Sequence, residues 1–106
     1  KSFDTFGPIG PSVVSLDQFS NPADLKITCD INGTRKQDSR TSDLIFDIPT
    51  LVEYLSGICT LEPGDLIFTG TPSGVGAATG EFLKPGDVIT TEIEGIGTMT
   101  NRCVAR

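Results

Sequence analysis

Apolar and polar positions alternate from Leu25 to Ile31. Because successive side chains of a strand point to opposite faces, this alternation predicts a strand with one apolar face and one solvated face. The pair Asn32-Gly33 follows, and it is the preferred sequence of a type I′ hairpin turn. A return strand is predicted over Thr34–Gln37. The segment therefore predicts a two-stranded hairpin.

The hydrophobic spacing becomes helical from Pro49 onward. Proline suits the first turn of a helix, Asp47 is a plausible N-cap, and Gly57 suits the end. The spacing predicts one main helix of about three turns, whose apolar face carries Leu51, Val52, Leu55 and Ile58.

The phrase Pro-Gly-Asp occurs at 63–65 and again at 85–87, each time before a β-prone run. Proline followed by glycine is typical of a type II turn, so each copy is predicted to start a strand, the first over Asp65–Thr69. The last eighteen residues predict two further strands around Gly95 and Gly97, which suit a turn or bulge. The Pro- and Gly-rich segment Lys1–Val14 predicts an extended, turning chain. The expected fold is β-rich, in the α+β class with one main helix, rather than a doubly wound sheet.

The composition narrows the range of partners. The 106 residues allow one compact domain or part of one, and Lys1 suggests a cut into something longer. A net charge of −6 without a basic stripe argues against nucleic acid as the main partner. The one local basic cluster is interrupted by Asp30, Asp38 and Asp43, which favours a solvated hairpin tip; it consists of Lys26, Arg35, Lys36 and Arg40. No apolar run reaches the length of about 18 residues that a membrane span needs, so no membrane partner is expected.

Three cysteines lie far apart, at positions 29, 59 and 103, and none forms a C-x-x-C pair. This argues against a zinc site or a disulfide framework, and it favours small buried hydrophobes in a reducing, cytoplasmic setting. Histidine is absent. Because histidine is the commonest general base near neutral pH, any chemistry must use lysine, carboxylate, hydroxyl or backbone groups, or groups from elsewhere.

The strongest candidate site is the uncharged loop that ends the stretch "GDLIFTGTPSGVG". Its glycines allow a ligand to approach backbone N–H groups closely, and the hydroxyls of Thr69, Thr71 and Ser73 suit a carboxylate or enol oxygen. The loop lacks the Lys-Ser/Thr of a phosphate-binding loop. A plain glycine-rich connection between strands is the alternative reading.

Two further candidates have ordinary explanations. Lys1 beside an apolar segment could stabilise an enolate, or it could be a solvated terminal lysine. Glu92 and Glu94 share one face of a predicted strand and could ligate a hard cation. Their alternation with Ile93 and its neighbours is also the ordinary pattern of a solvated face.

Four blocks of the sequence together resemble the C-terminal half of the fumarylacetoacetate hydrolase family, in order and with matching spacing. They are "KSFDTFGPIGP", "NGTRKQDSRTSDLIFDIPTLVEYLS", "LEPGDLIFTGTPSGVG" and "LKPGDVITTEIEGIGTMTN". The blocks look most like the bacterial 2-hydroxyhepta-2,4-diene-1,7-dioate isomerase and acylpyruvate hydrolase branch, which implies a role in the catabolism of aromatic compounds. The resemblance implies that residues 1–106 form the C-terminal portion of a single catalytic domain with a mixed β-roll or sandwich fold, usually a homodimer.

The resemblance also implies a reaction and site residues. Family members use Mg²⁺ or Mn²⁺ and act on 2-oxo or 2-hydroxy-dienoic dicarboxylic acids by isomerisation, C–C hydrolysis or decarboxylation. The lysine of the Lys-Ser-Phe motif, which corresponds to Lys1, helps to stabilise the enolate. The threonine of Thr-Gly-Thr-Pro, which corresponds to Thr71, binds a substrate carboxylate beside Gly70.

The family's metal ligands and its His–Glu pair lie upstream of the lysine motif and have no counterpart here. We therefore expect no metal ligand in this stretch, and we expect the stretch alone to be inactive. The alternatives are a non-catalytic binding module and a partner subunit that completes its site only in a complex.

Overall fold

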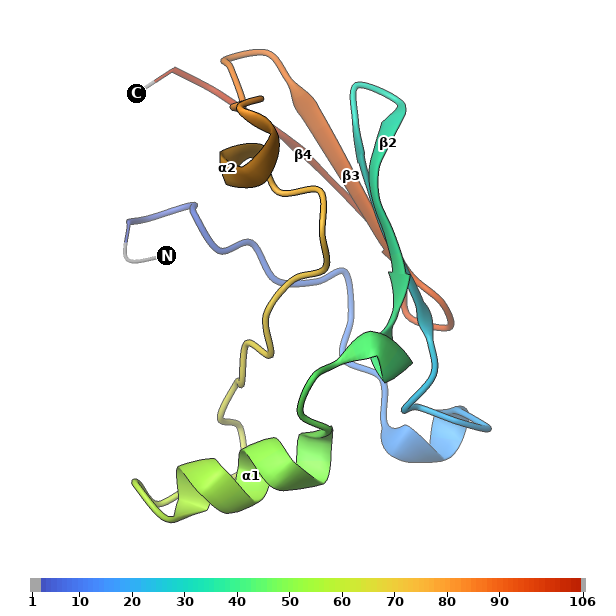
Figure 1. The fold of residues 1–106 in the computed structure, drawn as a ribbon, viewed down its shortest axis with the longest axis vertical. Helices are drawn as coiled ribbons and strands as arrows, with labels where there is room; N and C mark the ends of the chain where they lie inside the picture. Colours follow the sequence, from blue (N-terminus) through green and yellow to red (C-terminus); the bar gives the residue numbers. More distant parts are fainter. Residues whose placement is uncertain (1–2, 106) are drawn as a thin grey trace.

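The computed structural model describes residues 3–105, and the part it describes contains a four-stranded antiparallel sheet of order β2-β1-β3-β4. The strands are β1 (Lys26–Ile31), β2 (Thr34–Arg40), β3 (Val88–Ile93) and β4 (Gly97–Arg102). The main helix α1 (Ile48–Ser56) lies away from the sheet, beyond one of its ends. A short helix α2 (Gly76–Thr79) lies near the other end of the sheet (Figure 1). Two 3-10 turns, η1 (Leu16–Gln18) and η2 (Thr41–Asp43), complete the elements. The predicted β-rich α+β class is confirmed.

The predicted hairpin is confirmed as β1 and β2, and its return strand runs three residues beyond the predicted end at Gln37. The turn residues Asn32 and Gly33 both have positive φ, 51° and 78°, as a type I′ turn requires. The Asn32 side chain donates to Asp87 Oδ1 at 2.8 Å and accepts from the backbone N–H of Val88 at 2.9 Å. The tip of the hairpin is therefore tied to the start of β3.

Both Pro-Gly-Asp phrases form the predicted turns. Gly64 and Gly86 have φ of 102° and 96°, and in each turn the aspartate N–H donates to the carbonyl oxygen three residues earlier at 3.1 Å. The second turn leads into β3, as predicted. The predicted strand Asp65–Thr69 is wrong, because the segment is irregular and pairs with no strand within residues 3–105. Phe68 in this segment is 71% exposed.

Helix α1 begins and ends at the predicted cap residues, but Ile58, predicted on its apolar face, lies beyond the C-cap and is 67% exposed. The Asp47 carboxylate accepts from the backbone N–H of Thr50 at 2.9 Å, Pro49 lies in the first turn, and Gly57 forms the C-cap. The hydrogen bonds from Thr50 hold the pKa of Asp47 below its ordinary value. The cap therefore acts through the ionised carboxylate.

We expect Asp47→Ala to lower the thermal unfolding midpoint of the full-length protein at neutral pH, because the N–H of Thr50 loses its acceptor. The folded-state pKa of Asp47 is lowered, so its contribution is present above the ordinary pKa of 3.8 and is lost as pH falls through the folded value. The gap between wild type and variant should shrink in acid. Asp47→Asn, which keeps an acceptor, is the control and should stay close to wild type at neutral pH. A gap that is unchanged by acid would contradict an ionised cap.

The described fold has a sheet and a helix but no fully buried apolar side chain. Thr28, with 6% of its surface exposed, is the one buried residue among residues 3–105, whereas Ile45 and Val13 are 92% and 91% exposed. A folded domain normally covers most of its apolar surface. The layer that would cover α1 and the segment before it is absent from the described residues.

The cysteines only partly match the expectation of buried hydrophobes. Cys29 and Cys103 are half-buried, and burial raises the pKa of the Cys29 thiol. Cys59 is exposed, so the prediction of burial is wrong for this residue; it follows the end of α1, where no layer covers it. None of the helices within residues 3–105 is both long and apolar enough to cross a membrane.

Candidate functional site

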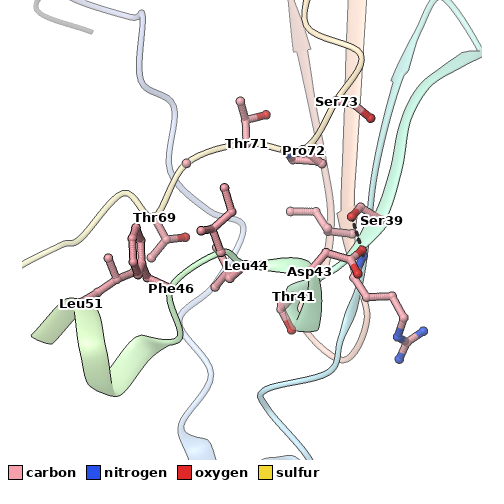
Figure 2. Close-up of a pocket in the computed structure, with 14 residues that line it drawn as sticks. Ser39, Thr41, Asp43, Leu44, Phe46, Leu51, Thr69, Thr71, Pro72 and Ser73 are labelled. Carbon is pink, nitrogen blue, oxygen red and sulfur yellow. Dashed lines mark hydrogen bonds between the residues drawn. The ribbon is translucent and has the colours of Figure 1, made fainter.

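A cleft of about 570 Å³ opens between residues 69–73 and the chain that joins β2 to α1. Figure 2 shows Leu44, Phe46 and Leu51 on one side of it and Ser39 and Asp43 toward the sheet. The two predicted substrate-binding residues, Gly70 and Thr71, both line the cleft. The glycine-rich loop therefore lines a cleft, which favours the predicted binding site over a plain connection between strands.

The loop is attached to the sheet through one side chain of β2. The Gln37 amide Nε2 donates to Thr71 Oγ1 at 2.9 Å, to the carbonyl oxygen of Pro72 at 2.8 Å and to that of Ser73 at 3.3 Å. All three acceptors belong to consecutive residues of the loop. A strand is a rigid support for a binding group, so this contact places Thr71 relative to the sheet.

The next part of the loop lies directly against the backbone of β2. A Cβ at Gly74, where φ is +98°, would lie 1.9 Å from the carbonyl oxygen of Lys36. A glycine is therefore required for this approach. The side chain of Lys36 forms an ion pair with Glu81, beyond α2. Residues 71–81 are thus held along β2 at three points.

The charged groups at the cleft are already paired. Asp43 accepts from Ser39 Oγ at 2.5 Å and from the backbone N–H of Arg40 at 3.0 Å, and the Ser39 hydrogen bond is the main cause of its lowered pKa. The Arg40 guanidinium lies 2.5 Å from Asp24 and 3.5 Å from Glu94. Arg40, the one cation that lines the cleft within residues 3–105, is therefore not free to bind an anion, and the loop residues that line it are uncharged.

Residues 3–105 do not fit a metal site, since no group of three or more His, Cys, Asp or Glu side chains in them could hold an ion. Glu92 and Glu94 are both exposed, and Glu94 accepts from the backbone N–H of Lys26 at 2.9 Å. Glu92 lies on the solvated face of β3, as the alternation indicates, whereas Glu94 lies just beyond the end of that strand. Lys1 lies outside the described residues, so its predicted role stays a prediction.

The sequence profile described as "Fumarylacetoacetate (FAA) hydrolase C-terminal" matches residues 1–104. The chain belongs to the fumarylacetoacetate hydrolase family. A fumarylacetoacetate hydrolase domain-containing protein 2 homolog from Dictyostelium discoideum is 51% identical, over 95% of this chain and 37% of its own length. A mitochondrial oxaloacetate tautomerase from Bos taurus is 44% identical, over 98% of this chain and 34% of its own length.

Solved structures of the family share the fold. A 2-hydroxyhepta-2,4-diene-1,7-dioate isomerase from Mycobacterium marinum superposes with a TM-score of 0.84 at 46% identity, over 96% of this chain and 37% of its own. A maleylpyruvate hydrolase from Sphingobium sp. SYK-6, in complex with manganese(II) and pyruvate, gives 0.88 at 37% identity, over 96% and 37%. The chain thus spans well under half the length of these fumarylacetoacetate hydrolase family proteins.

Sequence reasoning missed the contribution of β2 to the site. The sequence pattern places Gln37 only in a return strand, and nothing local to it signals a hydrogen bond to a loop 34 residues away. The predicted solvated hairpin tip fits Arg35, which is exposed near the turn and pairs with Asp30 and Asp38. It is wrong for Lys26, which is exposed but lies at the open end of the hairpin, opposite Arg40. Lys36 and Arg40 instead connect to distant segments, which gives them structural roles that the pattern did not indicate.

Proposed function

We propose that this chain is the substrate-orienting part of a divalent-metal-dependent enzyme of the fumarylacetoacetate hydrolase family. The substrate class is a 2-oxo or 2-hydroxy-dienoic dicarboxylic acid, and the reaction is isomerisation, C–C hydrolysis or decarboxylation. The observation that carries the proposal is that Gly70 and Thr71, whose hydrogen-bonding groups are neutral, both line the cleft. In the same proposal, residues 1–106 form the C-terminal portion of one catalytic domain of a homodimeric protein.

The names of the similar proteins support this substrate class. Pyruvate, present in the maleylpyruvate hydrolase complex, is a 2-oxo acid, and oxaloacetate, named in the tautomerase, is a 2-oxo dicarboxylate. Manganese(II) in the same complex supports a divalent ion in the full-length enzyme. Because residues 3–105 offer no metal ligand set, we propose that Mg²⁺ or Mn²⁺ is held by chain outside this sequence.

The residues of this chain orient the substrate and stabilise charge on it. The Thr71 hydroxyl and the Gly70 amide donate to one substrate carboxylate and so fix the direction of the bond that reacts. Isomerisation, cleavage and decarboxylation of 2-oxo acids all develop negative charge on the oxygen of the 2-oxo group. The Lys1 ammonium stabilises that charge.

The test is an assay of the full-length protein with Mn²⁺ or Mg²⁺, using oxaloacetate for tautomerisation and an acylpyruvate for hydrolysis. We expect turnover of at least one of them, lost on chelation with EDTA and restored by the ion. Pyruvate should compete with the substrate. Pyruvate binding without turnover of either substrate would favour the binding-module alternative, and neither binding nor turnover would contradict the proposal.

We expect Lys1→Met to lower kcat by about 100-fold, the usual cost of removing one group that stabilises transition-state charge. The KM and the affinity for Mn²⁺ should change much less, because the lysine acts on the enolate. Lys84→Met, at an exposed turn away from the cleft, is the control and should stay near wild type. A tenfold loss of Mn²⁺ affinity at unchanged kcat would refute the role of Lys1.

A further inference from the structure

We propose that Gln37 is a positioning residue that keeps the Thr71 hydroxyl in the donating orientation a substrate carboxylate needs. The inference rests on the proposed function, since it concerns the same carboxylate. It adds a residue from β2, about thirty-five positions earlier in the chain, to the loop that binds substrate.

The orientation of the Gln37 amide follows from its partners. The carbonyl oxygens of Pro72 and Ser73 can only accept hydrogen bonds, and they lie 2.8 and 3.3 Å from the terminal amide atom of Gln37. That atom must be the nitrogen, because an oxygen there would face two other acceptors. The nitrogen is then also the atom 2.9 Å from Thr71 Oγ1, and it donates to it.

The hydrogen bond from Gln37 determines which hydrogen-bonding capacity the Thr71 hydroxyl has left for a ligand. A hydroxyl that accepts from Gln37 still has one hydrogen to donate. Within residues 3–105, no other hydrogen-bond partner of the Thr71 hydroxyl is found. An ionised carboxylate can only accept hydrogen bonds, so it can pair with the hydrogen that the Thr71 hydroxyl still has to donate. Without Gln37 the hydroxyl can still donate, but no protein group in residues 3–105 fixes the direction of its hydrogen.

A second contact between the loop and β2 allows an experiment to distinguish a positioning role of Gln37 from simple attachment of the loop. The Lys36–Glu81 ion pair holds the same loop to the same strand, yet it touches neither Thr71 nor the residues on either side of it. If β2 only holds the loop in place, breaking this pair should act like losing Gln37. If Gln37 acts through the Thr71 hydroxyl, the two changes should differ.

The experiment is a double-mutant cycle in the full-length enzyme loaded with Mn²⁺, with pyruvate as the probe and its Kd measured by calorimetry. Gln37→Met, similar in length but without the amide donor, should weaken binding about fivefold, the usual worth of a neutral hydrogen bond. In a Thr71→Val background, the same change should cost less than about twofold, because the hydroxyl is already gone. Thr71→Ser should restore the full effect of Gln37→Met. Lys36→Met should stay within about twofold of wild type.

Three results would overturn the positioning role of Gln37, and a fourth would overturn the proposed function. An undiminished Gln37→Met effect in the Thr71→Val background, or an equal effect of Lys36→Met, would overturn the positioning role while leaving the carboxylate site intact. Wild-type Kd for Gln37→Met would do the same. If Thr71→Val itself binds pyruvate as wild type does, the proposed function fails instead. Should Gln37→Met not fold, Gln37→Leu supports the same cycle, and unfolding midpoints of every variant are measured alongside.

Discussion

Thr71→Val in the full-length enzyme is expected to raise the Kd for pyruvate and the KM for oxaloacetate by about 10- to 100-fold. The range is that of a hydrogen bond to a charged acceptor, which contributes about 1.5–3 kcal/mol. Thr71 lines the cleft, and its hydroxyl has one hydrogen to donate after accepting from Gln37 at 2.9 Å. Valine has the same shape without the hydroxyl, so the fold should be retained.

Two controls make this result specific. Thr71→Ser keeps the hydroxyl and should stay within a few-fold of wild type, whereas Ser73→Ala removes a different hydroxyl of the same loop and should change binding less than Thr71→Val. Unfolding midpoints establish that each variant is folded. Unchanged KM and kcat in Thr71→Val would refute the role of this hydroxyl in binding the carboxylate.

Gly74→Ala is expected to have the largest structural effect of any single substitution in the loop. The added Cβ would lie 1.9 Å from the Lys36 carbonyl oxygen and 2.9 Å from its carbon, so the loop and β2 must separate. The positive φ of +98° adds strain for any residue other than glycine, about 1–3 kcal/mol in general. We expect a marked fall in the free energy of unfolding together with weaker pyruvate binding, because Thr71 moves with the loop.

The matched control is Gly80→Ala. Gly80 also has a positive φ, +75°, but a Cβ there would meet no atom within 4 Å. It therefore reports the backbone strain without the collision. Urea unfolding of the two variants should show a clearly larger loss for Gly74→Ala, and equal losses would contradict the close approach of the loop to β2.

The features that the sequence predicts well are those that depend on neighbouring residues. Asn32-Gly33 forms its turn, Asp47 caps α1, and both Pro-Gly-Asp phrases turn the chain. In each case a backbone preference or a side chain within three residues decides the conformation. Such signals can be read without knowing what the segment packs against.

The features that the sequence does not predict depend on contacts with residues far away in the sequence. A strand needs a partner, and Asp65–Thr69 has none within residues 3–105, although its composition favours a strand. The contact of Gln37 with the loop has no local signal for the same reason. Its hydrogen bond partner Thr71 is 34 residues later in the sequence, after α1. The motif alone predicts Thr71 and Gly70 as site residues, and the structure adds that they line a cleft. Their contact with a carboxylate stays a prediction.

A crystal structure of the full-length protein with Mn²⁺ and pyruvate would show directly whether Thr71 binds the carboxylate. We expect the pyruvate carboxylate within hydrogen-bond distance of Thr71 Oγ1, about 2.7 Å, with Gln37 still donating to the same oxygen. We also expect metal ligands from outside residues 3–105. A carboxylate bound elsewhere, with the Thr71 hydroxyl facing solvent or another protein group, would contradict the central claim.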